Sequence, residues 1–393
     1  MGNISSNEMY GMNSAAKEYD GFNKYIRITD ISETSNKFVP NPLTSPDGEL
    51  EAKYQLQEGD LVFARTGAST GKTYLYDKND GNLYFAGFLI KFHIDKAVPK
   101  FIFYNTLKEE YLNWVSVMSV RSGQPGINST EYQKFPLYLP SLDEQNKISN
   151  FLSKIDEKIE LLENKHQYYQ DFKKYLMQQI FAQKLRFADN ENWKTVKLGD
   201  VCKITMGQSP SSENYSENNF HTVLIQGNAD IINGKVVPRV YTSEITKISK
   251  PGDIIMTVRA PVGDLAINEF ESCIGRGVCS IEGNKFIYYL LQSLKDNHVW
   301  ERLSQGSTFE SINSNDIKNL KVKMPSEETQ NTISLFLTEI DSKIELYEIQ
   351  FLTFQKLKKG LLQQMFVYIP IFMHTILNFC AKICCIKYFL KST

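Results

Sequence analysis

The chain has 393 residues, of which 42% are apolar and 23% charged, so it is a folded, two- or three-domain protein rather than a disordered or fibrous one. Its net charge of -1 gives no support for nonspecific nucleic-acid binding, and any DNA contact must rest on local patches or on a partner protein. The six cysteines form no disulfide framework and no cleavable signal sequence precedes them, which predicts reduced thiols and a cytoplasmic protein.

Residues 1–140 are predicted to form a mixed α/β domain. Its expected elements are strands over Tyr25 to Ile31 and Leu83 to Ile94, a helix near Pro99 to Tyr111, and an apolar strand that starts at Gly59-Asp60. That last strand leads through Arg65 into a loop, Gly67 to Thr73, which resembles a phosphate-binding P-loop. Only three residues separate its glycines, where a P-loop needs four. A nucleotide-hydrolysing enzyme is therefore a minor alternative.

Residues 141–188 are predicted to form one long helix with a coiled-coil seam. A helix of some 35 residues would be about 50 Å long, and so narrow an apolar stripe needs a partner helix to bury it. The apolar seam residues follow a strict 4-3-4-3 rhythm and are Ile148, Leu152, Ile155, Ile159, Leu162, Tyr169, Leu176 and Ile180, with His166 and Lys173 at the intervening seam positions.

Residues 189–325 are predicted to form a second mixed α/β domain that ends at Pro325. The expected elements are a strand over Thr222 to Ile225, a helix near Lys285 to Gln305, and an apolar strand that starts at Gly252-Asp253 and leads through Arg259 to Gly263. This half opens with Trp193 to Asp200, a strand and turn that the first half lacks. The first domain is therefore expected to be shortened at its N-terminus.

Residues 326–366 repeat the first helix. Shifting residues 127–181 by 185 positions aligns them with 312–366 without a gap, and roughly 25 of the 55 pairs are identical. The second seam consists of Ile333, Leu337, Ile340, Ile344, Tyr347, Phe351, Phe354, Leu361 and Met365.

The repeat predicts the fold class. We expect two mixed α/β (α+β) domains joined by two long helices that form an antiparallel coiled coil with pseudo-two-fold symmetry, one domain at each end; two ordinary core helices from a gene duplication are the alternative. Lys173 and Lys358 occupy the same seam position, so we expect them where the helix pair ends, or with their amines reaching outward.

Residues 367–393 form a hydrophobic tail without a counterpart in the repeat. A membrane-spanning helix needs about 20 consecutive apolar residues, and this tail is interrupted by Pro370, His374, Lys382 and Lys387. A foreign or frameshifted tail is the favoured interpretation, with a membrane anchor as the alternative.

No catalytic or metal-binding constellation emerges from the sequence. The five histidines lack the neighbouring serine, cysteine or carboxylate patterns of nucleophilic catalysis. The cysteines crowded into the tail lack the second pair of ligands that a zinc site needs. We therefore expect no catalytic residue and no metal in this chain.

The helical repeats carry a specific resemblance. Residues 143–148 read Asp-Glu-Gln-Asn-Lys-Ile and residues 328–333 read Glu-Thr-Gln-Asn-Thr-Ile, and both are followed by Leu-Xaa-Xaa-Ile-Asp-Xaa-Lys-Ile-Glu-Leu. Over residues 1 to about 366 the chain resembles the specificity subunit of bacterial type I restriction-modification systems. The resemblance implies two target-recognition domains that read the two halves of a bipartite site on double-stranded DNA.

The resemblance also implies the partners. In that family the specificity subunit is not a catalyst and binds no cofactor of its own. It delivers two modification subunits, which methylate adenine with S-adenosylmethionine, and two restriction subunits, which use ATP and Mg²⁺ to translocate and cut DNA. Because similarity is strong in the helices and weak in the domains, we expect the two half-sites to differ.

Arginine pairs with guanine through two hydrogen bonds, and lysine or backbone amides bind phosphates. The candidate DNA-binding residues are Arg27, Arg65, Lys72, Arg121, Gln124, Arg239, Arg259, Arg276 and Arg302. A surface charge or a salt bridge within the domain is the alternative for each one. Arg65 and Arg259 are preferred because both follow equivalent strands. A coiled-coil scaffold without DNA recognition and a defective, truncated allele remain alternatives for the whole chain.

Overall fold

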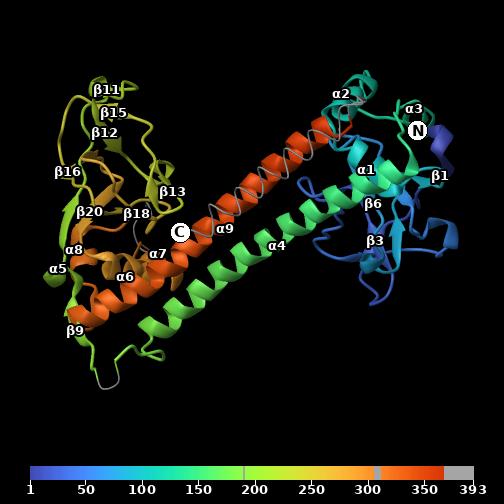
Figure 1. The fold of residues 1–393 in the computed structure, drawn as a ribbon. Helices are drawn as coiled ribbons and strands as arrows, with labels where there is room; N and C mark the ends of the chain where they lie inside the picture. Colours follow the sequence, from blue (N-terminus) through green and yellow to red (C-terminus); the bar gives the residue numbers. More distant parts are fainter. Residues whose placement is uncertain (189–190, 305–310, 367–393) are drawn as a thin grey trace. The chain divides into compact units, whose positions relative to one another are not determined.

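The computed structural model describes residues 1–188, 191–304 and 311–366. It divides into two compact units, one of Met1–Leu161 with the chain from Phe351 onward, and one of Leu162–Gln350. Each unit contains one mixed α/β domain and a part of each long helix (Figure 1). The hydrophobic tail over 367–393 lies outside the described residues.

The first unit is built on a four-stranded antiparallel sheet in the order β1-β8-β5-β6. Its strands are β1 (Ser5–Tyr10), β5 (Asp60–Ala64), β6 (Thr73–Leu75) and β8 (Leu89–Ile94). β5 is apolar along nearly its whole length because both its faces are covered. Leu61 and Phe63 face the core beneath the helices, whereas Val62 and Ala64 face the core on the opposite side.

Shorter elements cover the two faces of this sheet. They are the parallel pair β3 (Lys24–Ile26) and β7 (Leu83–Phe85), the pair β2 (Ala16–Glu18) and β4 (Thr44–Pro46), the helices α1 (Pro99–Asn105), α2 (Glu109–Met118) and α3 (Ser129–Gln133), and the short turns η1 (Gly2–Ile4), η2 (Ile28–Asp30), η3 (Ala52–Tyr54) and η4 (Lys78–Asp80). The strand predicted over Tyr25 to Ile31 ends early, because Asp30 accepts the Arg27 backbone N–H and closes a turn. The run from Leu83 to Ile94 is two strands separated by a turn.

The second unit contains the same frame with more strands. Its first sheet has the order β10-β20-β17-β18-β14-β13, its second β11-β15-β12-β19-β16, and β21 pairs with β9. The strands are β9 (Lys194–Lys197), β10 (Lys203–Met206), β11 (Tyr215–Ser216), β12 (Thr222–Ile225), β13 (Ile231–Ile232), β14 (Lys235–Val236), β15 (Tyr241–Thr242), β16 (Ile248–Ser249), β17 (Ile254–Thr257), β18 (Leu265–Ile267), β19 (Ser272–Ile274), β20 (Val278–Glu282) and β21 (Lys321–Met324). The helices are α5 (Leu198–Val201), α6 (Lys285–Asp296), α7 (Val299–Ser304) and α8 (Ser314–Lys318), with turns η5 (Ser212–Asn214) and η6 (Asn228–Asp230).

The internal repeat extends from the helices into both domains. The order β1-β8-β5-β6 matches β10-β20-β17-β18, and the parallel pair β3-β7 matches β12-β19. The same backbone bonds close both frames, since the Ile127 N–H donates to Arg65 C=O at 2.9 Å and the Ile312 N–H donates to Val258 C=O at 3.0 Å. The fold class predicted from the repeat is confirmed.

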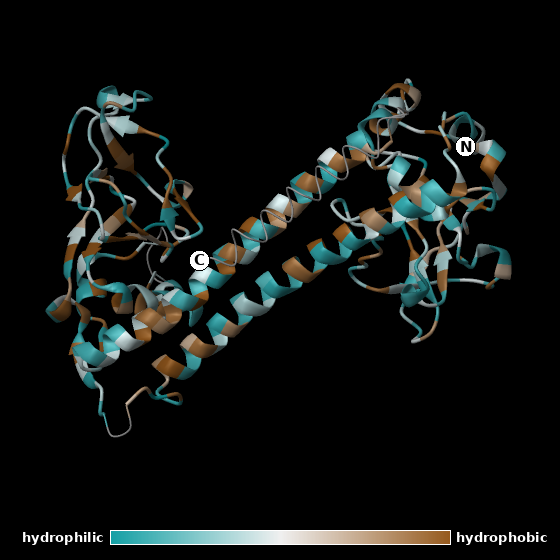
Figure 2. Cartoon of the chain, viewed as in Figure 1, coloured by the Kyte–Doolittle hydropathy of each residue, from teal (hydrophilic) through white to brown (hydrophobic). Residues whose placement is uncertain are grey.

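The two long helices, α4 (Leu142–Phe181) and α9 (Glu327–Gln364), run antiparallel within each unit. In the first unit the Asp156 carboxylate lies 2.6 Å from the Lys358 amine. In the second unit the Tyr169 and Tyr347 rings lie 5.3 Å apart, and Lys173 pairs with Asp341 at 2.6 Å. Every predicted seam residue is buried or half-buried, and Figure 2 shows apolar positions alternating with polar ones along both helices.

The seam also continues into the domain cores. Leu152 packs into the core of the first domain, and Ile333 and Leu337 pack into that of the second. The expectation that Lys173 and Lys358 reach outward is wrong. Their side chains are only 11% and 19% exposed, and each amine is paired with an aspartate of the facing helix.

Three cysteines fall within the described residues and all are free thiols buried in the second domain. Burial raises the pKa of Cys279 to about 12 and that of Cys202 to about 11, so neither is a thiolate near neutral pH. No helix among the described residues is long and apolar enough to cross a membrane.

Candidate nucleic-acid interface

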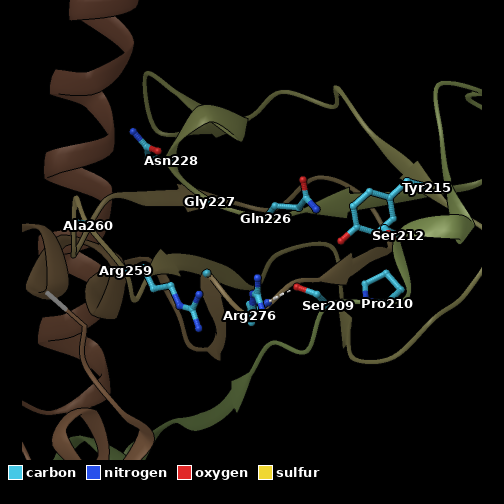
Figure 3. Close-up of a pocket in the computed structure, with 11 residues that line it drawn as sticks. Ser209, Pro210, Ser212, Tyr215, Gln226, Gly227, Asn228, Arg259, Ala260 and Arg276 are labelled. Carbon is cyan, nitrogen blue, oxygen red and sulfur yellow. Dashed lines mark hydrogen bonds between the residues drawn. The ribbon is translucent and has the colours of Figure 1, made fainter. Parts of the chain in front are cut away.

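A polar hollow of about 580 Å³ opens in the second domain, where loops from both of its sheets meet. Figure 3 shows its side chains, which come from four separate stretches of chain. The lining residues are Ser209, Pro210, Ser212, Tyr215, Gln226, Gly227, Asn228, Arg259, Ala260, Arg276 and Gly277. None of these residues is acidic, although the whole chain carries 45 acidic and 44 basic side chains.

Arg259 is the second residue after strand β17 and is exposed. Its backbone forms an isolated antiparallel bridge with Ser311, which fixes the direction in which the chain leaves the sheet. Within the described part of the chain its guanidinium forms no ion pair. The five N–H groups of the guanidinium are therefore available to a ligand.

Arg276 lies in the tight turn between β19 and β20. The turn packs so closely against the end of β12 that a Cβ on Gly277 would lie 2.1 Å from the Gln226 carbonyl oxygen. The Arg276 backbone N–H donates to Ser209 Oγ at 3.1 Å. These contacts hold the backbone, whereas the exposed guanidinium has no acidic partner among the residues that the structure describes.

Gln226 and Asn228 place two side-chain amides beside these arginines (Figure 3). The Gln226 backbone N–H donates to Asp230 Oδ2 at 2.8 Å, which anchors this loop from within. Neither amide side chain forms a hydrogen bond within the described residues. Amides can pair with the adenine edge and guanidinium groups with the guanine edge or phosphate, so the hollow contains side chains of the kinds that can bind DNA.

The sequence reasoning missed Gln226, Asn228, Ser209, Ser212 and Tyr215. For Gln226 a signal was present, because it directly follows an apolar strand, as the preferred arginines do. The other four come from segments whose approach to Arg259 depends on tertiary structure.

The corresponding place in the first domain has different chemistry. Arg65 is the first residue after β5, and its guanidinium lies over the rings of Tyr10 and Phe88, 5.0 and 5.8 Å from their centroids. Its Nε is buried without a hydrogen-bond partner among the described residues. Cation–π contact with two rings holds this side chain against the domain surface.

Arg65 and Arg259 are one residue out of step, although the strands before them are equivalent. The carbonyl that accepts the Ile127 N–H belongs to Arg65, whereas the carbonyl that accepts the equivalent Ile312 N–H belongs to Val258. Successive residues of an extended chain point to opposite sides. Thr66 is therefore the structural counterpart of Arg259, and Arg65 that of the buried Val258.

Most other candidates from the sequence are engaged within their own domain. Arg27 and Arg239 each bind a buried aspartate, Asp30 at 2.8 Å and Asp230 at 2.9 Å. The Lys72 amine donates to Ile31 C=O at 3.1 Å and pairs with the Glu33 carboxylate.

The remaining three candidates are exposed, Arg121 and Gln124 in the loop between α2 and α3 and Arg302 in α7. Arg121 pairs with Glu131 at 2.6 Å, and Arg302 donates to Asn297 C=O at 3.0 Å. Gln124 is exposed, with its amide beside Gly67. Of the nine predicted residues, the structure brings only Arg259 and Arg276 together in one hollow.

The P-loop-like segment does not direct its lysine into an open cradle. The turn from Gly67 leads directly into strand β6 rather than into a helix, and Lys72 is engaged as described. Within the described residues no group of three or more histidine, cysteine or acidic side chains is arranged to hold a metal ion.

Comparison with known proteins identifies the family. The family model described as "Type I restriction modification DNA specificity domain" matches residues 1–168 and 190–352. A Methanocaldococcus jannaschii protein described as a type I restriction enzyme specificity subunit, MjaX, is 30% identical over 334 residues, covering 79% of this chain and 78% of its own length. The MjaVIII specificity subunit of the same organism is 22% identical and covers 78% of each chain.

Solved structures share the fold. The S subunit of a type I restriction-modification system from M. genitalium matches with a TM-score of 0.61 at 15% identity, covering 94% of this chain and 95% of its own. A chain from a structure of type I restriction-modification complex assembly matches with a TM-score of 0.59 at 21% identity, covering 91% and 95%. The two matched domains and the relatives together show that this chain belongs to the type I restriction-modification DNA specificity family.

Proposed function

We propose that this specificity subunit binds a bipartite, asymmetric DNA site, with each domain reading one half. The observation that carries the proposal is that one backbone frame occurs twice with different groups at the equivalent place. Arg259 and Arg276 flank a hollow in the second domain. In the first domain Thr66 stands where Arg259 stands in the second, and the neighbouring Arg65 is half-buried between Tyr10 and Phe88. Different groups on one frame favour different base sequences.

The charge around the hollow supports a nucleic-acid ligand. Two arginines without acidic partners among the described residues create a local positive field in a chain that is otherwise nearly neutral. The hydroxyls of Ser212 and Tyr215 add groups that bind phosphate or base edges. A scaffold that only docks proteins has no need for such unpaired cations, and family membership does not favour that alternative.

The long helices supply surfaces for the protein partners. On α4 the rings of Tyr168 and Phe172 stack 6.0 Å apart on an exposed face, with Tyr175 exposed nearby. On α9 the side chains of Leu335 and Ile349 are exposed. Exposed apolar groups that lie together, as the rings on α4 do, mark protein interaction sites.

We assign these faces to the modification and restriction subunits, two of each, of a type I restriction-modification complex. This chain carries no catalytic step in that complex. S-adenosylmethionine, ATP and Mg²⁺ are used by the partner subunits, and this chain supplies sequence recognition and placement.

Salt dependence of DNA binding tests the proposal. In the complex with its modification subunits, affinity for a DNA probe should fall steeply with salt, because phosphate contacts release counterions. Arg259→Ala together with Arg276→Ala should reduce the slope of log affinity against log salt by about one for each phosphate that the variant no longer binds. Lys203→Ala is the matched control, since this exposed cation of the same domain is already paired with Glu282.

If affinity falls with salt and the double variant has the same slope as the wild type, the hollow is not the DNA contact. Salt-independent affinity in the assembled complex would contradict DNA reading by this chain.

A further inference from the structure

The tight turn that borders the hollow has an equivalent in the first domain. In the second domain the Val258 N–H donates to Gly277 C=O at 2.9 Å, directly before β20 begins. In the first domain the Arg65 N–H donates to Phe88 C=O at 3.0 Å, directly before β8 begins. Because Arg65 is the counterpart of Val258, Phe88 is the counterpart of Gly277.

The two turns present different side chains. In the second domain Arg276 lines the hollow and is followed by Gly277 (Figure 3). In the first domain Gly87 comes first and Phe88 follows. A Cβ on Gly277 or on Gly87 would lie 2.1 or 3.1 Å from a backbone oxygen of another segment, so both glycines are closely packed. The glycine and the projecting residue have therefore exchanged places, and the turn offers a cation in one domain and an apolar ring in the other.

The Phe88 side chain projects into solvent but is held on one side. The residue is 59% exposed. The Arg65 guanidinium lies over its ring, 5.8 Å from the centroid. The same guanidinium lies 5.0 Å from the centroid of the Tyr10 ring, and the Tyr10 hydroxyl accepts the Ser129 N–H at 3.2 Å. One face of the Phe88 ring is thus occupied by a cation that is itself held by a second, anchored ring.

The charge beside the ring favours DNA as the ligand. Within the described residues Arg65 forms no ion pair, so no carboxylate there neutralises its charge. An apolar protein surface would gain nothing from this cation, whereas double-stranded DNA carries one negative charge per about 1.7 Å of its axis. The exposed ring and the cation together fit a DNA groove better than a protein partner.

The chemistry of the ring narrows what it can read. The Phe88 side chain has no group that forms a conventional hydrogen bond, and the one apolar group on the base edges of the major groove is the C5 methyl group of thymine. The alternative is a wedge that separates two stacked bases. Such a wedge needs both faces of its ring, and the Arg65 guanidinium occupies one of them.

We infer that Phe88 is a specificity-determining residue of the first domain and contacts the methyl group of a thymine in the half-site that this domain reads. The inference rests on the proposed function and adds a residue and a base to it. The two half-sites are then read in different ways. An apolar contact selects a base in the first, whereas the polar side chains of the hollow bind the second.

The test is a double-mutant cycle between the ring and the methyl group. The chain is assembled with its modification subunits, and affinity is measured for a duplex that carries the motif found by sequencing methylated adenines. Each thymine of the motif is replaced in turn by deoxyuridine, which lacks only the methyl group. One replacement should weaken binding by the wild-type complex about fourfold, the ratio expected for one buried methyl group. The same replacement should have no effect on Phe88→Ala.

Two variants are matched controls. Phe88→Leu keeps an apolar side chain in the turn, so sensitivity to the same methyl group should remain. Phe22→Ala removes another phenylalanine of the first domain, which is 68% exposed in the turn between β2 and β3, and should also leave this sensitivity unchanged. Equal unfolding temperatures of the three variants and the wild type check that all of them fold.

Three outcomes would overturn the inference. They are the absence of any thymine whose replacement weakens wild-type binding, equal weakening of the wild type and Phe88→Ala at every position, and loss of assembly with the modification subunits in Phe88→Ala. The last would assign the ring to a protein contact. Failure of the proposed function is a separate result, because the wild-type complex would then bind the motif no more tightly than a scrambled duplex.

Discussion

The two globular domains share a frame but differ in what they expose. Backbone bonds, strand order and the packing of the sheet against the long helices recur in both. The groups that follow the central strands at Thr66 and Arg259, which we call the rim, do not recur. Thr66 in the first domain stands where Arg259 stands in the second. Positions that pack against the shared helices are constrained by one surface, whereas rim positions are free to differ. The proposed recognition of two different half-sites needs that freedom.

The parts that do recur include a polar network on each helix pair. In the first unit the Tyr104 hydroxyl donates to Asp156 at 2.8 Å, and Lys358 pairs with Asp156 at 2.6 Å. In the second unit Tyr289 donates to Asp341 at 2.7 Å, and Lys173 pairs with Asp341 at 2.6 Å. Burial, aided by the neighbouring carboxylate, raises the pKa of both tyrosines.

Each network takes its lysine from one repeat and its tyrosine and aspartate from the other. This explains why a lysine persists at a seam position of both helices. A cation there is costly alone, but it neutralises an aspartate that the facing helix provides. The pairing is possible only when the helices run antiparallel in this register.

The largest expected difference between the domains comes from the aspartate at the start of the central strand. Asp60 is buried, with its carboxylate 2.8 Å from His93 Nδ1 and 3.6 Å from the buried Lys91 amine. Asp60→Ala leaves that cation without its partner and should destabilise the first domain by about 3–5 kcal/mol. Hydrogen exchange of strand β5 in the full chain measures the loss.

The equivalent change in the second domain should cost less. Asp253 accepts hydrogen bonds from neutral groups, the Ser280 hydroxyl and the Lys250 backbone N–H, both at 2.8 Å. Asp253→Ala should therefore cost about 1–3 kcal/mol, read from exchange of strand β17. An equal or larger loss in the second domain would show that the charge on Lys91 does not set the difference.

The polar networks should instead show the two units to be alike. Lys358→Met and Lys173→Met should each lower the stability of their own unit by about 1–3 kcal/mol, because each aspartate loses its cation but keeps its tyrosine. Lys359→Met and Lys174→Met are controls, since these neighbours are exposed.

A double-mutant cycle with Asp156→Asn isolates the pair energy in the first unit. A large effect in only one unit would contradict equivalent roles for the two lysines.

Substitution of the arginines that follow the central strands, or lie beside them, should separate the domains by the DNA half-site affected. Arg259→Ala or Arg276→Ala should weaken DNA binding by about 1–3 kcal/mol and relax one half-site. Arg65→Ala should cost a similar amount at the other half-site if its guanidinium contacts a base. Unchanged affinity of a folded variant, measured in the assembled methyltransferase, would remove that residue from the interface.

The smallest expected effect concerns nucleotide. Lys72 in the loop of the first domain has Asp264 as its counterpart in the second. Lys72 pairs with Glu33, and Asp264 pairs with Lys295. Adding ATP to the isolated chain should leave its thermal unfolding unchanged. A dose-dependent rise in the unfolding temperature would revive nucleotide binding.

Much of the frame was predictable because it depends on spacing. The heptad rhythm from Ile148 onward and the 185-residue repeat predict the antiparallel helices, which begin two residues after Pro140 and Pro325. The rim was less predictable, because whether an arginine is paired within its domain depends on residues that are distant in sequence. Arg239 and Arg276 look alike in the sequence, yet Asp230 engages only Arg239.

The number of residues between the strand and the rim position also could not be predicted from the sequence. Arg65 and Arg259 both follow a Gly-Asp strand, but a difference of one residue places them on opposite sides of the chain. Sequence spacing alone did not reveal this, because it depends on which carbonyl closes the bond to Ile127 or Ile312.

Sequencing of methylated adenines tests the central claim most directly. The chain would be co-expressed with the modification subunits of the same genome, as wild type and as Arg259→Ala, in a host that lacks other adenine methylation. We predict a bipartite motif with two different fixed ends and an unspecified middle, of which Arg259→Ala relaxes one end only. A motif with identical ends, or relaxation of both ends at once, would contradict two independent readers on one frame.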